Sequence, residues 1–260
     1  MGDSISIVTV YPDLLGTYGD GGNAKVLAAR LKLRGIAVTS LEVRSSDPLP
    51  AGADIYLVGG GEDSPQVEAS KILSRTRVLH RAVENGSYVL AVCAGLQIFG
   101  EYFVDSEGND VPGLAILDCR SSKMPGARAV GELLVKTEID GKEELIVGYE
   151  NHGSSTQLGP DAKPFSRVVV GVGNSRTAKT DGIRYKNVIA TYMHGPVLAR
   201  NAELADSILR GVFGELPAIA DRSLSNLARQ LHRERVAAAL KSRKAKSVGR
   251  ATVGLPGRER

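Results

Sequence analysis

Residues 87–100 read SYVLAVCAGLQIFG, an apolar strand-like run that passes through a cysteine into a helix-like run. Small residues bracket Cys93, because Ala91 lies two positions before it and Ala94 and Gly95 follow it. This spacing is typical of a sharp strand–turn–helix elbow, in which only small neighbours permit so tight a turn. The elbow exposes the central side chain at a helix N-terminus, where the dipole favours a thiolate. The alternative is a buried, inert cysteine, which is common in such strands.

The sequence before this elbow alternates between strand-like and helix-like segments. Strands are expected at 4–11, 36–43, 54–59 and 87–92, and helices at 23–34, 65–84 and 94–102. The third strand is nearly all apolar, as expected where helices cover both faces of a sheet. The alternation predicts an α/β fold with a mostly parallel, doubly wound sheet and right-handed crossovers. In such a sheet the site lies at the carboxyl ends of the strands, where the elbow is.

The second half of the chain has a different character. Strand-like pieces at 132–138, 145–149, 167–173 and 188–192 are separated by Gly, Asn and Pro turns, and helices are expected at 201–213 and 223–241. This pattern predicts a more antiparallel half. We expect one catalytic domain over residues 1–215, a C-terminal helix at 216–241 and a basic, disordered tail at 242–260. Leucines 224, 227 and 231 share one face of the last helix, which docks either on the body or on a partner.

Charge and composition exclude several classes of protein. The chain carries +4 overall, but residues 241–260 hold seven Lys or Arg against one acid, so the tail carries +6 and the body −2. The body therefore offers no basic footprint for nucleic acid, and the tail suits at most a peripheral membrane contact. Neither an apolar run of ~18 residues nor a signal peptide is present, so a cytoplasmic location is expected. Two cysteines without a CxxC pair predict neither disulfides nor a metal site.

A glycine-rich loop, GGGED at 59–63, directly follows the third strand. Glycines allow the backbone to turn so that its amides face a ligand. We expect the amide of Gly60 or Gly61, together with that of Ala94, to stabilise an oxyanion near Cys93. A phosphate-binding loop is the competing interpretation. It is disfavoured because the P-loop lysine and the GxGxxG spacing are absent and acidic residues follow the glycines.

Among the four histidines, His194 is the best candidate for a catalytic base. It ends the apolar strand VIATYMHGP, directly before a Gly-Pro turn. His152, in GYENHGSS, is a weaker candidate that shapes the pocket, whereas His80 and His232 are expected on the solvated surface. Cys119 lacks small flanking residues and is expected to be inert.

These segments together resemble the class I (triad-type) glutamine amidotransferases, and within them the branch related to cobyric acid synthase. The resemblance covers about residues 5–240 and rests on YPDLLGTYGDGGN (11–23), LVGGGEDSPQ (57–66), VCAGLQIFGE (92–101), GYENHG (148–153) and TYMHGP (191–196). It implies a flavodoxin-like fold and hydrolysis of L-glutamine, with Cys93 as nucleophile and His194 as acid and base. It also implies that Arg128 and Gln97 bind glutamine. Arg120 is a rival to Arg128.

One departure from the class concerns the residue that orients the histidine. Most members have His-x-Glu, but Pro196 stands in that place here. The branch resembled here also tends to lack this glutamate. The site is then either a Cys–His dyad or a triad completed by another carboxylate, for which Asp20 and Glu150 are the candidates.

The sequence contains no GxxxxGK[ST] motif, so ammonia released here must be used by another chain. The resemblance implies a heterodimer with a Mur ligase-like, ATP-dependent synthetase, in which ATP and Mg²⁺ bind the partner and no cofactor binds this chain. That partner would activate D-glutamate in the lipid II stem peptide for amidation, a step of cell-wall synthesis. The alternatives are a glutaminase serving a cobyric acid-type synthetase and a catalytically silent binding module.

Overall fold

The computed structural model describes residues 4–251 and the side chains of residues 4–242. Its central element is a six-stranded sheet in the order β13-β14-β4-β3-β1-β2. Every neighbouring pair is parallel except the antiparallel edge pair β13–β14. Counted from the β2 edge, the five parallel strands have the order β2-β1-β3-β4-β14, which is the flavodoxin-like winding and confirms the predicted fold class. The strands are β1 (Ile5–Val10), β2 (Val38–Val43), β3 (Ile55–Val58), β4 (Tyr88–Val92), β13 (Ile183–Tyr185) and β14 (Val188–Thr191).

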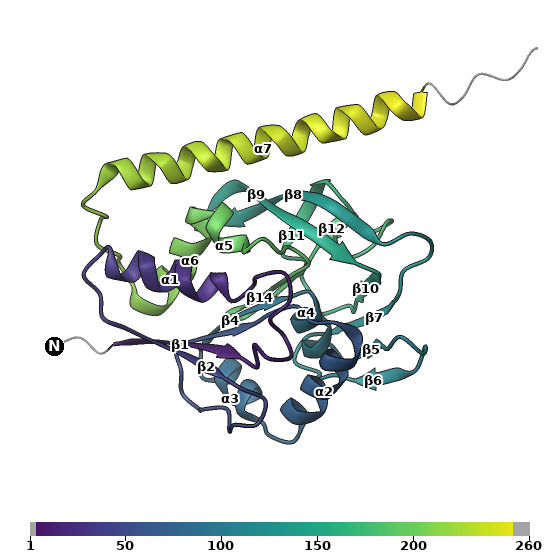
Figure 1. Ribbon diagram of the computed structural model, residues 1–260, viewed down its shortest axis with the longest axis horizontal. Coiled ribbons are helices and arrows are strands. Elements are labelled where there is room, and N and C mark those ends of the chain that lie inside the picture. The colour runs from purple at the N-terminus through teal and green to yellow at the C-terminus, as the bar shows by residue number, and fades with distance from the viewer. Residues whose placement is uncertain (1–3, 252–260) are drawn as a thin grey trace, which may run out of the picture.

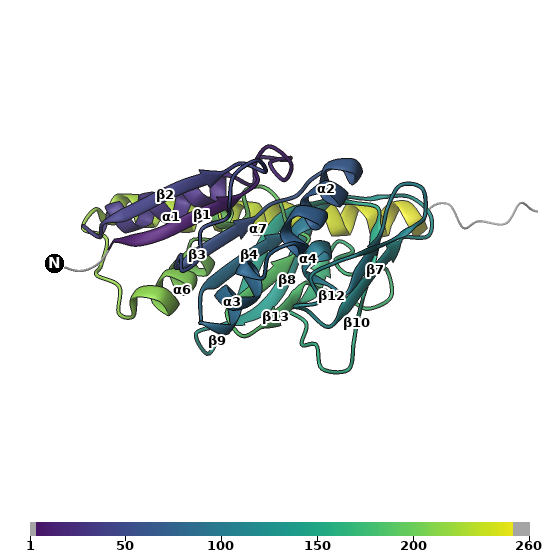
Figure 2. The same cartoon turned by 90° about the horizontal axis from the view of Figure 1, so that it is seen from below.

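Helices cover both faces of this sheet, as the alternation predicts (Figure 1, Figure 2). One face is covered by α1 (Gly22–Lys32), α5 (Val197–Arg200) and α6 (Ala202–Phe213), and the other by α2 (Asp63–Ser74) and α3 (Val78–Glu84). The short helix α4 (Ala94–Phe99) follows β4 at its carboxyl end. The single helix predicted at 65–84 is wrong, because the chain breaks at the exposed sequence SRTR. The break lets Leu73 and Leu79, which lie on either side of it, both enter the core.

Two smaller sheets, largely antiparallel as predicted, contain the strands near 132–138, 145–149 and 167–173. One has the order β10-β7-β5-β6 and the other β12-β11-β8-β9. The strand at 188–192 does not follow that prediction, because it is β14 and pairs in parallel with β4 in the central sheet. The longest hairpin joins β8 to β9 through Asp140 and Gly141, which both have positive φ values of 50° and 75°. An Asp-Gly pair adopts this two-residue turn readily. The strands are β5 (Tyr102–Val104), β6 (Asp110–Pro112), β7 (Cys119–Lys123), β8 (Ala129–Ile139), β9 (Lys142–His152), β10 (Ser154–Leu158), β11 (Ser166–Val170) and β12 (Thr180–Asp181).

The last helix, α7 (Arg222–Ala251), lies across the sheet that contains β8, β9 and β11 (Figure 1). Ala239 is fully buried there beside Leu134 and Val147, and Val236 packs against the same cluster. The helix ends at Ala251 rather than at residue 241, so the predicted disordered tail begins too early. The Lys, Arg and Ala of this stretch are good helix formers, which explains the extension. The remainder of that predicted tail, residues 252–260, lies outside the described residues.

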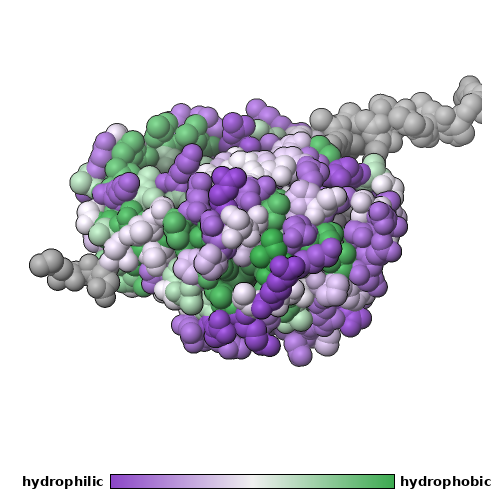
Figure 3. Space-filling model, turned by 60° about the horizontal axis from the view of Figure 1, so that its bottom comes forward, coloured by the Kyte–Doolittle hydropathy of each residue, from purple (hydrophilic) through white to green (hydrophobic). Residues whose placement is uncertain are grey.

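The leucines predicted to share one helical face do not dock on the body. Leu224, Leu227 and Leu231 are 42%, 51% and 51% exposed. Within residues 4–251, no helix is long and apolar enough to cross a membrane. The face of the molecule drawn in Figure 3 mixes hydrophilic and hydrophobic residues.

Candidate active site

Cys93 lies at the tip of a strained turn between β4 and α4. Its φ of 53° and ψ of −102° fall in a region that side chains with a Cβ rarely adopt, at a cost of about 1–3 kcal/mol. The turn is possible because Gly95 packs against β3, where an added Cβ would lie 2.5 Å from the carbonyl oxygen of Val58. Ala91 and Ala94 are also fully buried. The elbow predicted from the small residues is therefore present, and Cys93 is 7% exposed at its tip.

His194 lies at the end of the neighbouring strand. Because β14 pairs with β4 in parallel, with Thr191 opposite Val92, the two strand ends bring His194 and Cys93 to the same edge of the sheet. The His194 backbone is held by two hydrogen bonds with Tyr149, of 3.0 and 2.8 Å. Its side chain is 1% exposed. Backbone pairing and burial together fix the imidazole before any substrate binds.

The carboxylate that contacts His194 belongs to Asp20. Nδ1 of the imidazole lies 2.9 Å from Oδ2 of Asp20, which also accepts a hydrogen bond of 2.9 Å from the Gly60 amide. Nε2 of His194 has no hydrogen-bond partner among the described residues. Glu150, the other candidate, instead accepts hydrogen bonds from the amides of Val172 and Gly173. The structure therefore places Asp20, and not Glu150, beside the histidine.

The motif YGDGGN holds Asp20 in this position because it packs directly on the turn after His194. The side-chain oxygen of Asn23 accepts a hydrogen bond of 3.0 Å from the Leu198 amide. A Cβ at Gly22 would lie 2.2 Å from Cγ of Pro196, so only glycine allows this approach. Pro196 replaces the glutamate of the usual His-x-Glu pattern. Its close contact with Gly22 helps to place the neighbouring Asp20 carboxylate beside His194.

The surroundings of His194 favour its protonated form. Burial alone would lower its pKa, but the hydrogen bond to Asp20 and the interaction with Cys93 outweigh burial and raise the pKa of His194 to about 10. An imidazolium beside a thiol in turn favours the thiolate, which is the nucleophilic form. His194 is thus a protonated imidazole at neutral pH, held through Nδ1 by the Asp20 carboxylate.

The oxyanion donors differ in part from the prediction. The Gly60 amide is occupied by Asp20, so it does not serve as a donor to substrate in this arrangement. The amides of Gly61 and Ala94 have no acceptor within the described part of the chain, so these two remain available. Gly60 has a steric role instead, because a Cβ there would lie 2.6 Å from Cε1 of His194.

This arrangement agrees with the comparison of the chain with known families. A model of the CobB/CobQ-like glutamine amidotransferase domain matches residues 6–202. The chain belongs to this family. It is 35% identical over 207 residues to the lipid II isoglutaminyl synthase (glutamine-hydrolyzing) subunit GatD of Staphylococcus aureus, covering 78% of this chain and 83% of that relative. The GatD subunit of Streptococcus pneumoniae is 33% identical over 226 residues, covering 84% and 86%.

Two further comparisons bear on the domain and the fold. A probable cobyric acid synthase of Methanothermobacter thermautotrophicus is 36% identical over 118 residues, or 41% of this chain and 23% of that protein. The glutaminase domain of Trypanosoma brucei CTPS, solved with bound acivicin, aligns with a TM-score of 0.53 at 12% identity. The alignment covers 83% of this chain and 96% of that one. This second likeness shows the fold alone.

The two arginines predicted as candidates for binding glutamine, Arg128 and Arg120, have different partners. Its guanidinium lies 3.4 Å from the backbone and side-chain oxygens of Asn151, in the ENHG motif. Arg120 forms an ion pair of 2.7 Å with Glu101 and is already used. Arg128 is exposed, and it makes no ion pair among the described side chains. Arg128 therefore has a guanidinium without a carboxylate partner among the described side chains, whereas Arg120 has one.

Gln97 lies in a buried hydrogen-bond network next to the elbow. Its carbonyl oxygen accepts a hydrogen bond of 2.8 Å from Gln66, and its amide donates to the Tyr192 hydroxyl at 3.4 Å. The Tyr192 hydroxyl also forms a hydrogen bond of 2.5 Å with the Thr156 hydroxyl. Both polar ends of Gln97 are thus engaged within the protein, and its contact with glutamine stays a prediction. This buried network supports the elbow from behind.

The other histidines make structural contacts. His152 is buried and stacks on Tyr192 with ring centroids 3.9 Å apart, while its Nδ1 bonds the Ser154 carbonyl oxygen at 2.9 Å. His80 and His232 are only partly exposed, and each bonds a backbone carbonyl, at 2.7 and 2.9 Å respectively. The expectation that these last two are solvated surface residues is therefore wrong.

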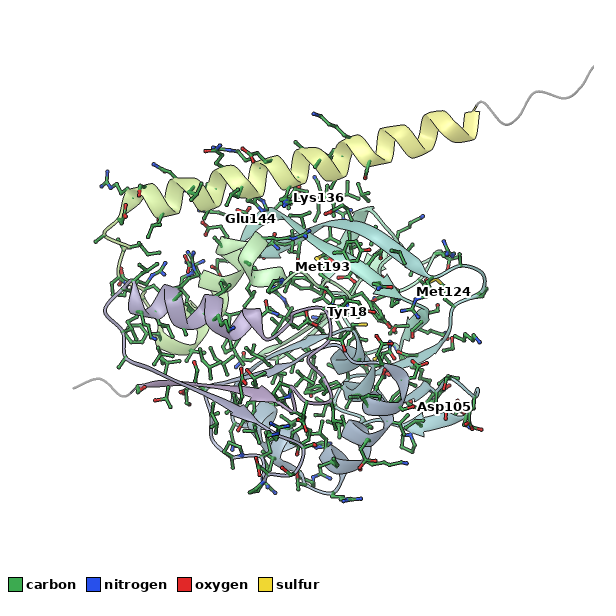
Figure 4. All side chains as sticks on the ribbon, viewed as in Figure 1. Tyr18, Asp105, Met124, Lys136, Glu144 and Met193 are labelled. Atoms are coloured by element: carbon green, nitrogen blue, oxygen red, sulfur yellow. The ribbon has the colours of Figure 1, made fainter. Side chains whose placement is uncertain are left out.

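Two residues near the site were not singled out from the sequence. The Tyr18 ring lies 4.8 Å from the His194 ring (Figure 4 labels Tyr18 and Met193, the residue before His194). Asp181 is fully buried, and it holds the end of β14 through Thr191 at 2.5 Å and the Tyr192 amide at 3.1 Å. Burial raises the pKa of Asp181 to about 6. Tyr18 lies within the YGDGGN motif, which signals it, but Asp181 has no local signal.

Proposed function

We propose that this amidotransferase is a glutaminase subunit that hydrolyses L-glutamine to glutamate and ammonia. The observation that carries the proposal is the contact between His194 and Asp20 beside the elbow cysteine. A nucleophile, a base and an orienting carboxylate in this relation are what acyl transfer through a thioester requires.

The reaction follows from the positions of these groups. The Cys93 thiolate attacks the side-chain amide carbon of glutamine, and the amides of Gly61 and Ala94 stabilise the oxyanion of the tetrahedral intermediate. The His194 imidazolium donates its proton to the departing nitrogen, so ammonia leaves and a γ-glutamyl thioester remains. The neutral imidazole then removes a proton from water, which attacks the thioester carbon. The C–S bond breaks, glutamate is released, and the Cys93 thiolate and the His194 imidazolium are restored.

We further propose that the ammonia passes to a Mur ligase-like, ATP-dependent synthetase that amidates D-glutamate in the lipid II stem peptide. The support is that the two GatD relatives are named as subunits of a lipid II isoglutaminyl synthase and that this chain spans 83% and 86% of their length. ATP and Mg²⁺ belong to the partner in this proposal. The protein then works on the cytoplasmic side, near the membrane that carries the lipid-linked acceptor.

The test of this function is nitrogen transfer. The full chain, purified with the synthetase that co-purifies with it, receives glutamine labelled with ¹⁵N at the amide, ATP, Mg²⁺ and lipid II. The expected product is lipid II with one labelled amide, detected by mass spectrometry. Labelled ammonia without labelled lipid II, together with labelling of a corrinoid acid by its synthetase, would favour the cobyric acid-type alternative instead.

Arg128→Ala is expected to raise the KM for glutamine while leaving the fold intact. The exposed guanidinium is proposed to bind the α-carboxylate, and a charged hydrogen bond contributes about 1.5–3 kcal/mol, or roughly tenfold to a hundredfold in KM. Steady-state assays of glutamate release measure it. The matched control is Arg120→Ala, which removes an arginine already paired with Glu101. A normal KM in Arg128→Ala with a raised KM in Arg120→Ala would reverse the assignment.

A further inference from the structure

An acidic side chain that the proposed reaction does not use lies directly after Gly61, a proposed oxyanion donor. Glu62 follows Gly61 directly and is the exposed N-cap residue of α2. Its carboxylate accepts a hydrogen bond of 3.3 Å from the Tyr18 hydroxyl. The loops that carry these residues are tied together by a hydrogen bond of 3.2 Å from the Thr17 amide to the Gly60 carbonyl oxygen. Glu62 is therefore held at the rim next to a proposed oxyanion donor.

Tyr18 connects this carboxylate to the catalytic groups. Its ring lies 4.8 Å from that of His194 at an interplanar angle of 52°, so the phenol covers the imidazole while its hydroxyl reaches the rim. Its backbone has φ 64°, which is unfavourable for a residue with a side chain and shows that the surrounding turn holds it there. Tyr18 thus packs its ring against His194 and donates a hydrogen bond from its hydroxyl to the Glu62 carboxylate.

Arg128 acts on the same phenol with the opposite charge. Burial and the Glu62 carboxylate raise the pKa of Tyr18, the Arg128 guanidinium lowers it, and Cys93 raises it. The Tyr18 phenol is therefore close enough to Glu62, Arg128 and Cys93 for their charges to act on it. Neither Glu62 nor Arg128 forms an ion pair with another side chain among residues 4–242, so each charge is without an ionic partner there.

A free α-amino acid has two opposite charges at the end away from its side-chain amide. We propose that Glu62 binds the α-ammonium group of glutamine, opposite the α-carboxylate on Arg128, and that Tyr18 is the positioning residue for Glu62. The inference rests on the proposed glutaminase function and deepens it. Since Gly61 offers its amide to the oxyanion and Glu62 is the next residue, consecutive residues then recognise the two ends of the substrate.

The assignment makes the enzyme selective for free glutamine. A substrate that lacks the ammonium group leaves Glu62 without a partner, and one that carries an acyl group on this nitrogen loses the charge altogether. Glutaramate, which is glutamine without its α-amino group, separates this contribution from all others because its amide and carboxylate are unchanged.

The test compares Glu62→Gln with the wild type on both substrates, using the full-length chain alone and with its synthetase. With glutamine, KM is expected to rise about 10- to 100-fold with kcat nearly unchanged, since a charge-assisted hydrogen bond is lost. With glutaramate, kcat/KM is expected to stay within about twofold, because that substrate never used the carboxylate. Tyr18→Phe is expected to raise the KM for glutamine by a smaller factor.

The matched control is Glu68→Gln, an exposed carboxylate on the same helix, which leaves both substrates unaffected. Equal losses on glutamine and glutaramate in Glu62→Gln would overturn the inference and assign Glu62 to loop shape. An unchanged KM for glutamine would overturn it as well. A wild-type chain without Cys93-dependent hydrolysis would overturn the proposed function itself, which is a separate and recognisable outcome.

Discussion

Cys93→Ala is expected to reduce glutamine hydrolysis to the uncatalysed background. The variant has no nucleophile for the amide carbon, so the thioester pathway is closed rather than slowed. Its fold should persist, because alanine keeps the Cβ and the same backbone strain at φ 53°. Glutamate release and ammonia release measure the loss, and a thermal melt checks the fold. Cys93→Ser is expected to be equally inactive, since a hydroxyl has no thiolate character.

The control is Cys119→Ala, which removes the other free cysteine. Burial raises the pKa of Cys119 to about 12, so its sulfur is a neutral thiol at any pH of interest. Hydrolysis by Cys119→Ala is expected to match that of the wild type. Comparable losses in both alanine variants, at equal thermal stability, would refute the assignment of Cys93.

The elbow was predictable because its cause is local. Ala91, Cys93, Ala94 and Gly95 lie within five consecutive positions, and the close packing of Gly95 on β3 depends only on the absence of a side chain. The position of His194 was predictable for a similar reason, since a strand end and a Gly-Pro turn mark the carboxyl edge of a parallel sheet. The sheet order then brings the two residues together without any further information.

The orienting carboxylate was not predictable in the same way. Asp20 and His194 are separated by 174 positions, and Glu150 lies next to Tyr149, which is directly paired with His194. Sequence position therefore favours neither candidate. Tertiary packing selects Asp20. Gly22 fits closely against Pro196, which brings Asp20 to His194, whereas Glu150 accepts hydrogen bonds from the amides of Val172 and Gly173.

The same limit explains the partial success with the glycine loop. The sequence shows that the loop exposes amides, but it does not show which amide another side chain already occupies. The Gly60 amide is taken by Asp20, and this single hydrogen bond ties the oxyanion loop to the carboxylate that orients the base. A buried polar group shared between two functional elements arises only from tertiary packing.

His194→Ala is expected to lower turnover by about 10²- to 10⁴-fold, the usual contribution of general acid–base catalysis. The structural reason is that Nε2 of His194 is the only ring nitrogen left for proton transfer, because Nδ1 is held by Asp20. Stopped assays of glutamate release over long incubations measure the residual rate. His152→Ala is the matched comparison and is expected to cost less, because that imidazole is engaged with Ser154 and Tyr192. A dead His152 variant beside an active His194 variant would reverse the two roles.

Asp20→Asn tests the same pair through pH. In the wild type His194 has a pKa of about 10, so the acid that protonates the leaving nitrogen is retained at neutral pH and lost only as pH rises through that value. Removing the Asp20 charge lowers the pKa of His194, and the alkaline limb of kcat/KM is expected to move to lower pH.

The raised pKa of His194 also contributes to folding stability, and this contribution is likewise lost at high pH. A folded-state pKa raised above about 6.5 contributes stability that is complete below that pH and is lost as pH approaches 10. The variant should therefore melt at a lower temperature at neutral pH, and the difference should shrink at high pH. An alkaline limb at the same pH in both proteins would show that Asp20 does not set the charge of His194.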